Sequence, residues 1–236
     1  MSTTTPMSRA VLWARFNVMR HLRKPGTLAW ILGVAAIAGL IRVAGGSTSA
    51  IANLVVLYAV PLAGLSFGTS AMREEIEDQT LTYVFTRSVD RAWIYVARVL
   101  AAITVAALVG IAGSVLATSS VTGGLRTVIA AVGSAVAYTA FFALCGVLFK
   151  RAASVGIVFA IAWEYGLGAV PGFLSQLTLR THLRSLADLR PSNTLLARLW
   201  DPPSVWISGL VILGVAVVTT FVAAMLVRRR EFVITR

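Results

Sequence analysis

The sequence predicts an all-α, polytopic membrane protein with six transmembrane helices, and three observations lead to this fold class. The chain has 236 residues, of which 58% are hydrophobic and 13% are charged, whereas soluble domains are about 45–50% apolar and about 25% charged. The apolar residues gather in six runs close to the ~20 residues that cross a bilayer as a helix. Most Lys and Arg residues border these runs, where such residues orient membrane helices and contact lipid headgroups.

The six predicted spans cover residues 27–43, 51–71, 93–116, 125–149, 152–170 and 205–227. The first span is short and contains Arg42, whose long side chain can extend to the headgroup region. A cleaved signal peptide is the less favoured alternative for this span, because its basic leader is long and no clean A-x-A site follows. The uncharged stretch 45–49 predicts a tight turn between the first two spans.

The distribution of basic residues predicts the orientation of the chain. An even number of spans places both termini on one side, and that side holds fifteen of the 21 Lys and Arg residues. The positive-inside rule therefore predicts that both termini and the loop 72–92 lie in the cytoplasm. Four of the six remaining basic residues lie in one outer segment, 171–204. The reversed topology would require five basic residues of the N-terminal leader to cross the membrane.

Residues 1–26 precede the first span and predict an amphipathic helix in the cytoplasmic interface. Residues 7–24 place Val11 and Val18 on one side of a helical wheel and Arg9 and Arg20 on the other, which is typical of interfacial helices. The Pro25-Gly26 pair would end this helix and turn the chain into the membrane. A basic leader without regular structure remains the alternative.

The loop 72–92, between the second and third spans, holds five of the nine acidic residues of the chain. Acids near its start and apolar residues at helical spacing favour a helix, because the helix dipole favours negative charge in the first turn. A solvated run of charges that only links two spans is the alternative. As a docking element, the loop would present Glu74, Glu75, Glu77, Asp78, Thr80, Leu81, Arg87 and Arg91.

The outer segment 171–204 predicts an amphipathic helix between the fifth and sixth spans. Leu179 and Leu183 fall on one face, and Arg184 and Asp188 are spaced to form an i,i+4 pair on another. Asp201 followed by proline predicts a second helix start. The segment either lies on the outer surface or re-enters the membrane, which is allowed where protein covers its backbone.

Glu164 is the only acidic residue inside a predicted span. A charged carboxylate at this depth costs several kcal/mol, about 2.5–3.5 on insertion scales, so a basic partner, a water-filled cavity or protonation must offset it. Arg126, Arg180 or Arg184 would reach it if the outer segment folds inward. Glu164, Arg180 and Arg184 are therefore candidate intramembrane or gate residues. A structural pair that fixes the outer segment is favoured over a site on a translocation path.

The remaining motifs argue against chemistry within this chain. Residues 64–68 match the G-x-S-x-G pattern, but Ser66 lies inside a predicted span, where small residues more often pack helices together. The sequence has no P-loop pattern, no H-E-x-x-H metal spacing, and Cys145 is its one cysteine. The net charge of +12 comes without a basic face interleaved with aromatic residues, so nucleic acid is not an expected partner.

Together these features resemble the ABC-2 type permeases, the membrane subunits of ATP-driven exporters. The resemblance covers nearly the whole chain: six spans, an N-terminal amphipathic helix, a charged loop after the second span and an amphipathic outer segment after the fifth. The loop of that family often runs from an acid through Gly-Thr-Leu to a proline and a basic residue. Here Thr80, Leu81 and Arg91 match, while Gln79 replaces the glycine and Ser88 the proline.

The resemblance implies a permease subunit of an exporter in a prokaryotic cell membrane. It implies a dimer with a second copy or a homologue, and two copies of a separate ABC ATP-binding subunit that holds ATP and Mg. The loop 72–92 would be the coupling helix, the outer segment would form re-entrant gate helices, and this chain would hold no cofactor and perform no catalysis. A stand-alone membrane enzyme and a membrane scaffold subunit are the alternatives. Short outer loops favour a small molecule, lipid or ion over a protein as substrate.

Overall fold

The computed structural model describes residues 15–77, 91–115, 121–170, 172–190 and 202–229. Every regular element within these residues is a helix, and six helical segments are long and apolar enough to cross a membrane. The bounds of these spans are Pro25–Val43, Thr48–Ala71, Arg91–Val115, Gly123–Leu148, Ala152–Ala169 and Val205–Arg229. Each agrees within a few residues with a predicted span, so the all-α, six-span prediction is confirmed.

Two of the spans are composite helices. The second span consists of α3 (Thr48–Leu54), the π-helix η1 (Val55–Ala59) and α4 (Val60–Glu77). The fifth consists of α8 (Ala152–Phe159), the π-helix η2 (Ala160–Gly166) and the 3-10 turn η3 (Leu167–Ala169). The other elements are α2 (Pro25–Val43), α6 (Arg91–Val115), α7 (Val121–Leu148), α9 (Phe173–Gln176), α10 (Leu179–Ala187) and α12 (Val205–Arg229).

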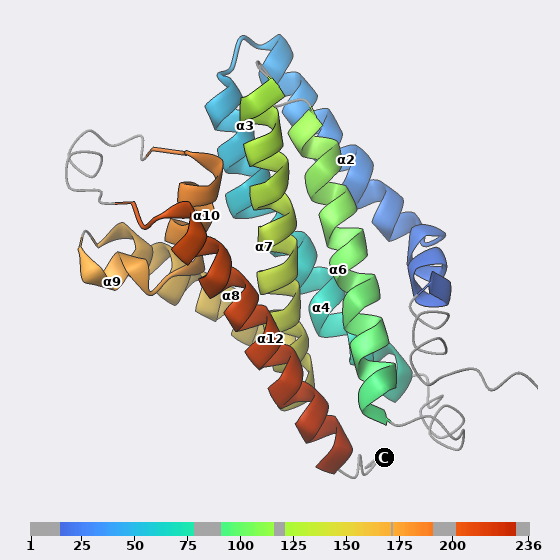
Figure 1. Ribbon diagram of the computed structural model, residues 1–236. Coiled ribbons are helices and arrows are strands. Elements are labelled where there is room, and N and C mark those ends of the chain that lie inside the picture. Colours follow the sequence, from blue (N-terminus) through green and yellow to red (C-terminus); the bar gives the residue numbers. More distant parts are fainter. Residues whose placement is uncertain (1–14, 78–90, 116–120, 171, 191–201, 230–236) are drawn as a thin grey trace, which may run out of the picture.

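The fourth span, α7, lies at the centre of the bundle and contacts α4, α6, α8, α10 and α12 (Figure 1). Its most extensive contact is with α4, where small residues let the two backbones approach closely. A Cβ added at Gly68 would lie 2.7 Å from the carbonyl oxygen of Thr139. A Cβ at Gly146 would lie 2.9 Å from the carbonyl oxygen of Thr69. The interface therefore has no room for larger side chains at these glycines.

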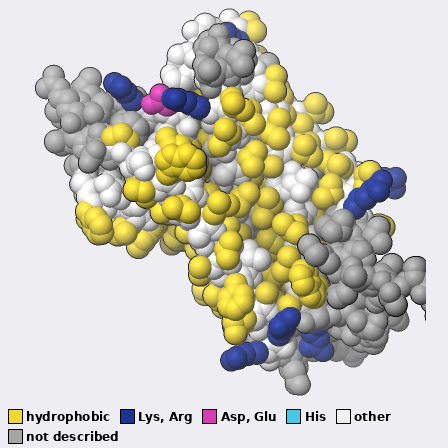
Figure 2. All heavy atoms as spheres, viewed as in Figure 1, with side chains coloured by type: hydrophobic (Ala, Val, Ile, Leu, Met, Phe, Trp, Pro, Cys, Tyr) yellow, Lys and Arg dark blue, Asp and Glu magenta, His cyan; other side chains and the backbone are white. Residues whose placement is uncertain are grey.

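Hydrophobic side chains cover the outside of the bundle as well as its core. On the face shown in Figure 2 they extend across the helices, while Lys and Arg side chains lie around the margins. Leu40 on α2 and Leu210 on α12 are 69% and 71% exposed. Exposed leucines at this density are stable in lipid rather than in water, which agrees with a multi-pass membrane protein.

The basic residues define one end of the bundle, which we call the basic end. Lys24, Arg91, Arg151 and Arg229 flank the spans there, and Pro25 begins α2 at the first helical position, as expected of proline. Residues 15–22 form a helix just before this point, while residues 1–14 of the predicted interfacial helix lie outside the described residues.

The turn between the first two spans lies at the opposite end. Gly45 has φ +78°, a backbone conformation that suits glycine, and the Ser47 hydroxyl accepts a hydrogen bond from the N–H of Ala50. This arrangement caps α3 and confirms the predicted tight turn. The predicted helix start at Asp201-Pro202 is wrong, because α12 begins at Val205 and the Ser204 hydroxyl caps it by accepting from the N–H of Ile207.

The outer segment folds back against the bundle. Its helix α10 lies beside α7 and α12, with Leu179 and Leu183 buried as predicted. The start of α10 and Tyr138, near the middle of α7, both contact Glu164 and so lie at the same level. The end of α10 lies beside Arg126, near the start of α7. The described part of this segment, residues 172–190, therefore packs along the first half of α7.

Candidate functional site

Glu164 is the buried residue of the π-helix η2, with 2% of its surface exposed. Its neighbours Ala162 and Trp163 are exposed, so this part of the fifth span faces outward except at the carboxylate. A π-helix widens the turn, and such turns are frequent at functional sites. The widened turn brings the one acidic side chain of the spans into the interior.

The carboxylate of Glu164 accepts three hydrogen bonds. The Tyr138 hydroxyl donates at 2.9 Å, the Leu179 N–H at 3.2 Å and the Arg180 N–H at 2.9 Å. The two amides belong to the first turn of α10, where helix N–H groups have no partner in their own helix and the dipole favours negative charge. Thr178, the residue before α10, makes no side-chain cap, so Glu164 of the fifth span caps this helix instead.

A basic side chain is one of the partners expected for Glu164, and the geometry differs from this expectation. Arg180 contributes its backbone N–H, and the described residues contain no ion pair between Glu164 and a guanidinium. Arg126 pairs with Asp188 at 2.9 Å. The predicted Arg184–Asp188 pair is therefore wrong, because Asp188 adopts a left-handed conformation that ends α10 and directs its carboxylate toward α7.

The Arg180 side chain lies over two tyrosine rings. Its guanidinium carbon is 4.5 Å from the ring centre of Tyr165 and 5.8 Å from that of Tyr58, which is cation–π geometry. One terminal nitrogen lies 3.4 Å from the Tyr58 hydroxyl. The Nε atoms of Arg180 and Arg184 are buried and have no hydrogen-bond acceptor among the described residues.

Arg184 follows one turn after Arg180 on α10. Burial, and then the positive charge of Arg180, lower the pKa of Arg184. The two guanidinium groups therefore concentrate positive charge beside the tyrosines, with Glu164 held by the helix amides.

The other π-helix, η1, contributes Tyr58 to this cluster. Its widened turn leaves carbonyl groups that neighbouring spans satisfy: the Ser134 hydroxyl donates to the carbonyl of Val56 and the Tyr165 hydroxyl to that of Leu57, both at 2.9 Å. Within a membrane, freed backbone groups need such partners. The two π-helices are therefore connected to each other through Tyr165.

A groove of about 340 Å³ lies between the second and fifth spans, with α7 as its floor. One end, near Leu65, Phe142 and Ile157, is apolar, and the other end holds the polar cluster. We call it the span 2–span 5 groove. It is lined by Leu57, Tyr58, Pro61, Leu62, Leu65, Tyr138, Phe142, Ile157, Ala160, Ile161, Glu164, Tyr165 and Arg180.

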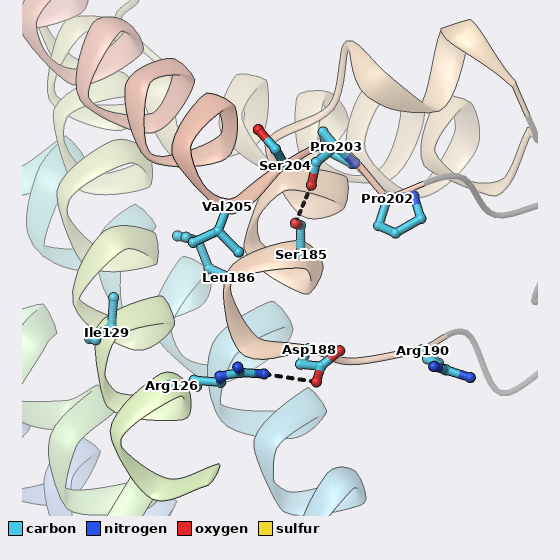
Figure 3. A pocket seen from close by; sticks show the side chains of 10 residues that line it. All are labelled: Arg126, Ile129, Ser185, Leu186, Asp188, Arg190, Pro202, Pro203, Ser204 and Val205. Carbon is cyan, nitrogen blue, oxygen red and sulfur yellow. Dashed lines mark hydrogen bonds and ion pairs between the residues drawn. The ribbon is translucent and has the colours of Figure 1, made fainter. Parts of the chain in front are cut away.

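A second pocket, shown in Figure 3, lies between the start of α7, the end of α10 and the start of α12. The Arg126–Asp188 ion pair lies at one side of it, and the Ser185 hydroxyl donates to the carbonyl of Pro203 at the other (Figure 3). Both members of the ion pair are more than half exposed. This pocket has no buried charged side chain and is the weaker candidate for a site.

His182 connects the outer segment to the sixth span. Its Nε2 lies 2.9 Å from the carbonyl oxygen of Gln176, so this nitrogen carries the hydrogen, and Nδ1 lies 3.3 Å from the Ser208 hydroxyl and accepts from it. Burial lowers the pKa of His182. The ring therefore acts as a neutral hydrogen-bonding link between α9, α10 and α12.

The predicted docking residues have little described structure. Glu74, Glu75 and Glu77 lie on the last turns of α4, which extends to Glu77, and Arg91 begins α6. The structure thus brings the two edges of the loop to the basic end. Asp78, Thr80, Leu81 and Arg87 lie outside the described residues.

The G-x-S-x-G pattern lies in the middle of α4. Ser66 is exposed on the helix and does not occupy the strand-to-helix turn that a serine nucleophile of this pattern requires. The flanking Gly64 and Gly68 face Thr139 on α7. The packing interpretation of these glycines agrees with this geometry.

Sequence reasoning found Glu164, Arg180 and Arg184 but missed the tyrosines that surround them. Tyr58, Tyr138 and Tyr165 come from three different spans, and their hydroxyl groups lie among apolar residues. A hydroxyl inside an apolar run needs a hydrogen-bond partner. Tyrosines within predicted spans are therefore a signal that could have indicated buried polar contacts.

Searches of protein-family models and of curated proteins give no match to this chain. The interpretation of the site therefore depends on its own geometry and on the sequence.

Proposed function

We propose that this chain is the permease subunit of an ATP-driven ABC-2 type exporter. The observation that carries the proposal is the loop 72–92: the most acidic stretch of the chain joins two spans at the basic end, and the sequence has no nucleotide-binding motif of its own. This charged element, in the proposal, docks a partner that supplies energy. In the proposal, two ABC ATP-binding subunits hold ATP and Mg, and a second permease chain completes the path.

The proposal places the chain in the cell membrane of a prokaryote with both termini in the cytoplasm. The basic end would be cytoplasmic, because Lys and Arg residues are retained on that side during insertion. The re-entrant α9–α10 segment would then lie toward the outside. Its connection to the fifth span through Glu164 suits a gate, since movement of the span would move α10 as well.

The proposal is tested by purifying the tagged chain from cells that also express the ATP-binding subunit encoded nearest to it. We expect the ATPase to co-purify with the chain. The double reversal Glu74→Lys and Glu75→Lys should reduce this association at least about tenfold, since several charge-assisted contacts of about 1.5–3 kcal/mol each would be lost.

The matched control is Glu231→Lys, which reverses an acid near the C-terminus, on the same side of the membrane in the proposal but outside the loop. It should leave both co-purification and membrane insertion unchanged. Unaltered ATPase recovery with the double reversal, or transport activity from the purified chain without nucleotide, would count against the proposal.

A further inference from the structure

We infer that the span 2–span 5 groove binds a single-chain amphiphile with an anionic head, its head against Arg180 and its hydrocarbon tail along Leu62 and Ile157. This inference deepens the proposed exporter function by naming a class of substrate, and as a transport substrate it rests on that proposal. Binding itself depends only on the groove.

The apolar part of the groove matches a hydrocarbon tail. Leucine, isoleucine, proline and phenylalanine side chains line it from Leu57 to Leu65 on one side and from Ile157 to Ile161 on the other. Leu62 and Ile161 are 51% and 64% exposed, so the groove is open along its length. A tail can therefore enter sideways from the lipid, without crossing a polar barrier.

The polar end matches an anionic head. Glu164 is the one acidic lining residue, and its carboxylate already accepts from Tyr138 and from two amides of α10. Arg180 adds a guanidinium to the lining, and its Nε has no acceptor among the described residues. A phosphate or carboxylate oxygen in the groove would accept charge-assisted hydrogen bonds from this guanidinium.

The tyrosines fix the position of the head. Tyr58 and Tyr165 lie with ring centres 5.4 Å apart, and both lie beneath the Arg180 guanidinium. Tyr165 is itself fixed by donating to the carbonyl of Leu57. The guanidinium is thus oriented before a ligand arrives, which reduces the entropy lost on binding.

The volume of the groove limits the size of the ligand. At about 340 Å³ it lies near the lower end of the range of roughly 300–1,000 Å³ for small-molecule sites. This volume accommodates one hydrocarbon chain rather than the two of a common phospholipid. A two-chain lipid should therefore compete poorly.

The test uses the full chain in phosphatidylcholine nanodiscs and a photoactivatable dodecyl phosphate with a diazirine in its tail. Illumination followed by peptide mass spectrometry measures labelling of the groove residues. We expect labelling there that excess dodecyl phosphate reduces at least about tenfold and that dodecyltrimethylammonium does not reduce. Arg180→Gln should lower this labelling about tenfold, since a charge-assisted bond contributes about 1.5–3 kcal/mol.

A pair of matched variants tests the path of the tail. Ala160→Phe adds a ring inside the groove, whereas Ala162→Phe adds the same ring on the exposed face of the same π-helix. We expect Ala160→Phe to abolish groove labelling and Ala162→Phe to leave it unchanged. The thermal midpoint of each variant, measured by tryptophan fluorescence, shows that the fold is retained, and Arg180→Gln keeps the backbone N–H that binds Glu164.

Equal competition by the cationic amphiphile, or labelling unaffected by both Arg180→Gln and Ala160→Phe, would overturn the inference. A disulfide test gives a further outcome, in which the chain carries Leu62→Cys and Cys145→Ser. If a disulfide forms between two copies and dodecyl phosphate does not prevent it, a second copy covers the groove and the inference is overturned. Labelling that follows the expected pattern in a chain that fails to recover an ATPase supports the binding site and contradicts only the exporter proposal.

Discussion

The α4–α7 interface and the region around Glu164 solve the problem of packing in a membrane in opposite ways. Between α4 and α7, glycines bring backbones so close that a single added carbon at Gly68 would lie 2.7 Å from the carbonyl oxygen of Thr139. Around Glu164, two π-helices widen the spans and leave a groove of about 340 Å³ beside buried polar groups. Close fit stabilises the first region, whereas hydrogen bonds stabilise the second and leave space for a ligand.

The largest expected effect tests the hydrogen-bonded region. Glu164→Lys would place a positive charge against two amide N–H groups and the positive end of α10, at a cost of about 3–5 kcal/mol for an uncompensated buried charge. Glu164→Gln keeps one acceptor but turns an NH₂ group toward a donor, at a cost of about 1–3 kcal/mol. We expect size-exclusion profiles of a fluorescent fusion to show most folded protein for wild type, less for Gln and least for Lys.

Equal loss of folded protein in the two Glu164 variants would contradict the capping role of the carboxylate, because Gln keeps one acceptor for the α10 amides and Lys keeps none.

The next effect tests the close-packed region. Gly68→Ala should destabilise the bundle by about 1–3 kcal/mol, because the added methyl group meets the backbone of α7 and one helix must shift. The control is Gly214→Ala on α12, where nothing lies within 4 Å of the added carbon. Alanine favours a helix more than glycine does, so the control should be neutral or slightly stabilising. Thermal unfolding monitored by tryptophan fluorescence measures the stability of both variants. Similar midpoints for Gly68→Ala and Gly214→Ala would mean that the α4–α7 interface is not closely packed at Gly68.

A smaller effect is expected at the widened turn of the second span. Ser134→Ala removes the donor to the carbonyl of Val56, which should cost about 1 kcal/mol of stability. Thr104→Val is the control, since its hydroxyl is exposed and donates to Leu100 within its own helix. A larger midpoint shift for Thr104→Val than for Ser134→Ala would mean that η1 does not depend on its neighbours.

His182 predicts a pH dependence of stability. Burial lowers its pKa in the folded chain, so below the ordinary histidine pKa of about 6.5 the unfolded chain binds the proton more readily. Stability from the neutral ring is therefore present above about pH 6.5 and is lost as the pH falls toward the folded-state pKa. We expect the thermal midpoint to fall between about pH 7.5 and about pH 5.5. His182→Gln should flatten this dependence, and an unchanged slope would exclude His182 as its source.

The smallest effect is expected at the Arg126–Asp188 pair on the surface. Both side chains are more than half exposed, so Arg126→Gln should cost less than about 1 kcal/mol and the cost should shrink as salt increases. A shift as large as that of Glu164→Gln would mean that this pair, rather than the Glu164 cap, holds the outer segment.

The spans could be predicted from the sequence because membrane insertion depends on the summed hydropathy of about twenty residues. The carboxylate at Glu164 was equally visible, as one acid in an apolar run. Two of its three described partners were not, because the amides of Leu179 and Arg180 are backbone groups that carry no mark in the sequence. Spacing alone also paired Arg184 with Asp188, whereas the end of α10 directs Asp188 to Arg126.

The two π-helices were also beyond sequence reasoning. Residues 55–59 are an ordinary apolar run, and Glu164 within residues 160–166 indicates a buried polar group but not a π-helix. What permits the widened turns is a set of tertiary hydrogen bonds from Ser134 and Tyr165, which only the packed bundle creates. The groove between the two spans follows from these contacts and has no local signal.

The continuity of α4 has a mechanical consequence. This helix extends from the π-helix η1 to Glu77 without interruption, a length of about 27 Å at 1.5 Å per residue. A force on its Glu77 end would tilt the helix as a stiff rod. The close glycine contacts with α7 would act as the pivot of this tilt. The far end of the rod adjoins η1, in which the carbonyl of Leu57 accepts from Tyr165. A small tilt at one membrane surface would therefore reach the ring on which the Arg180 guanidinium rests.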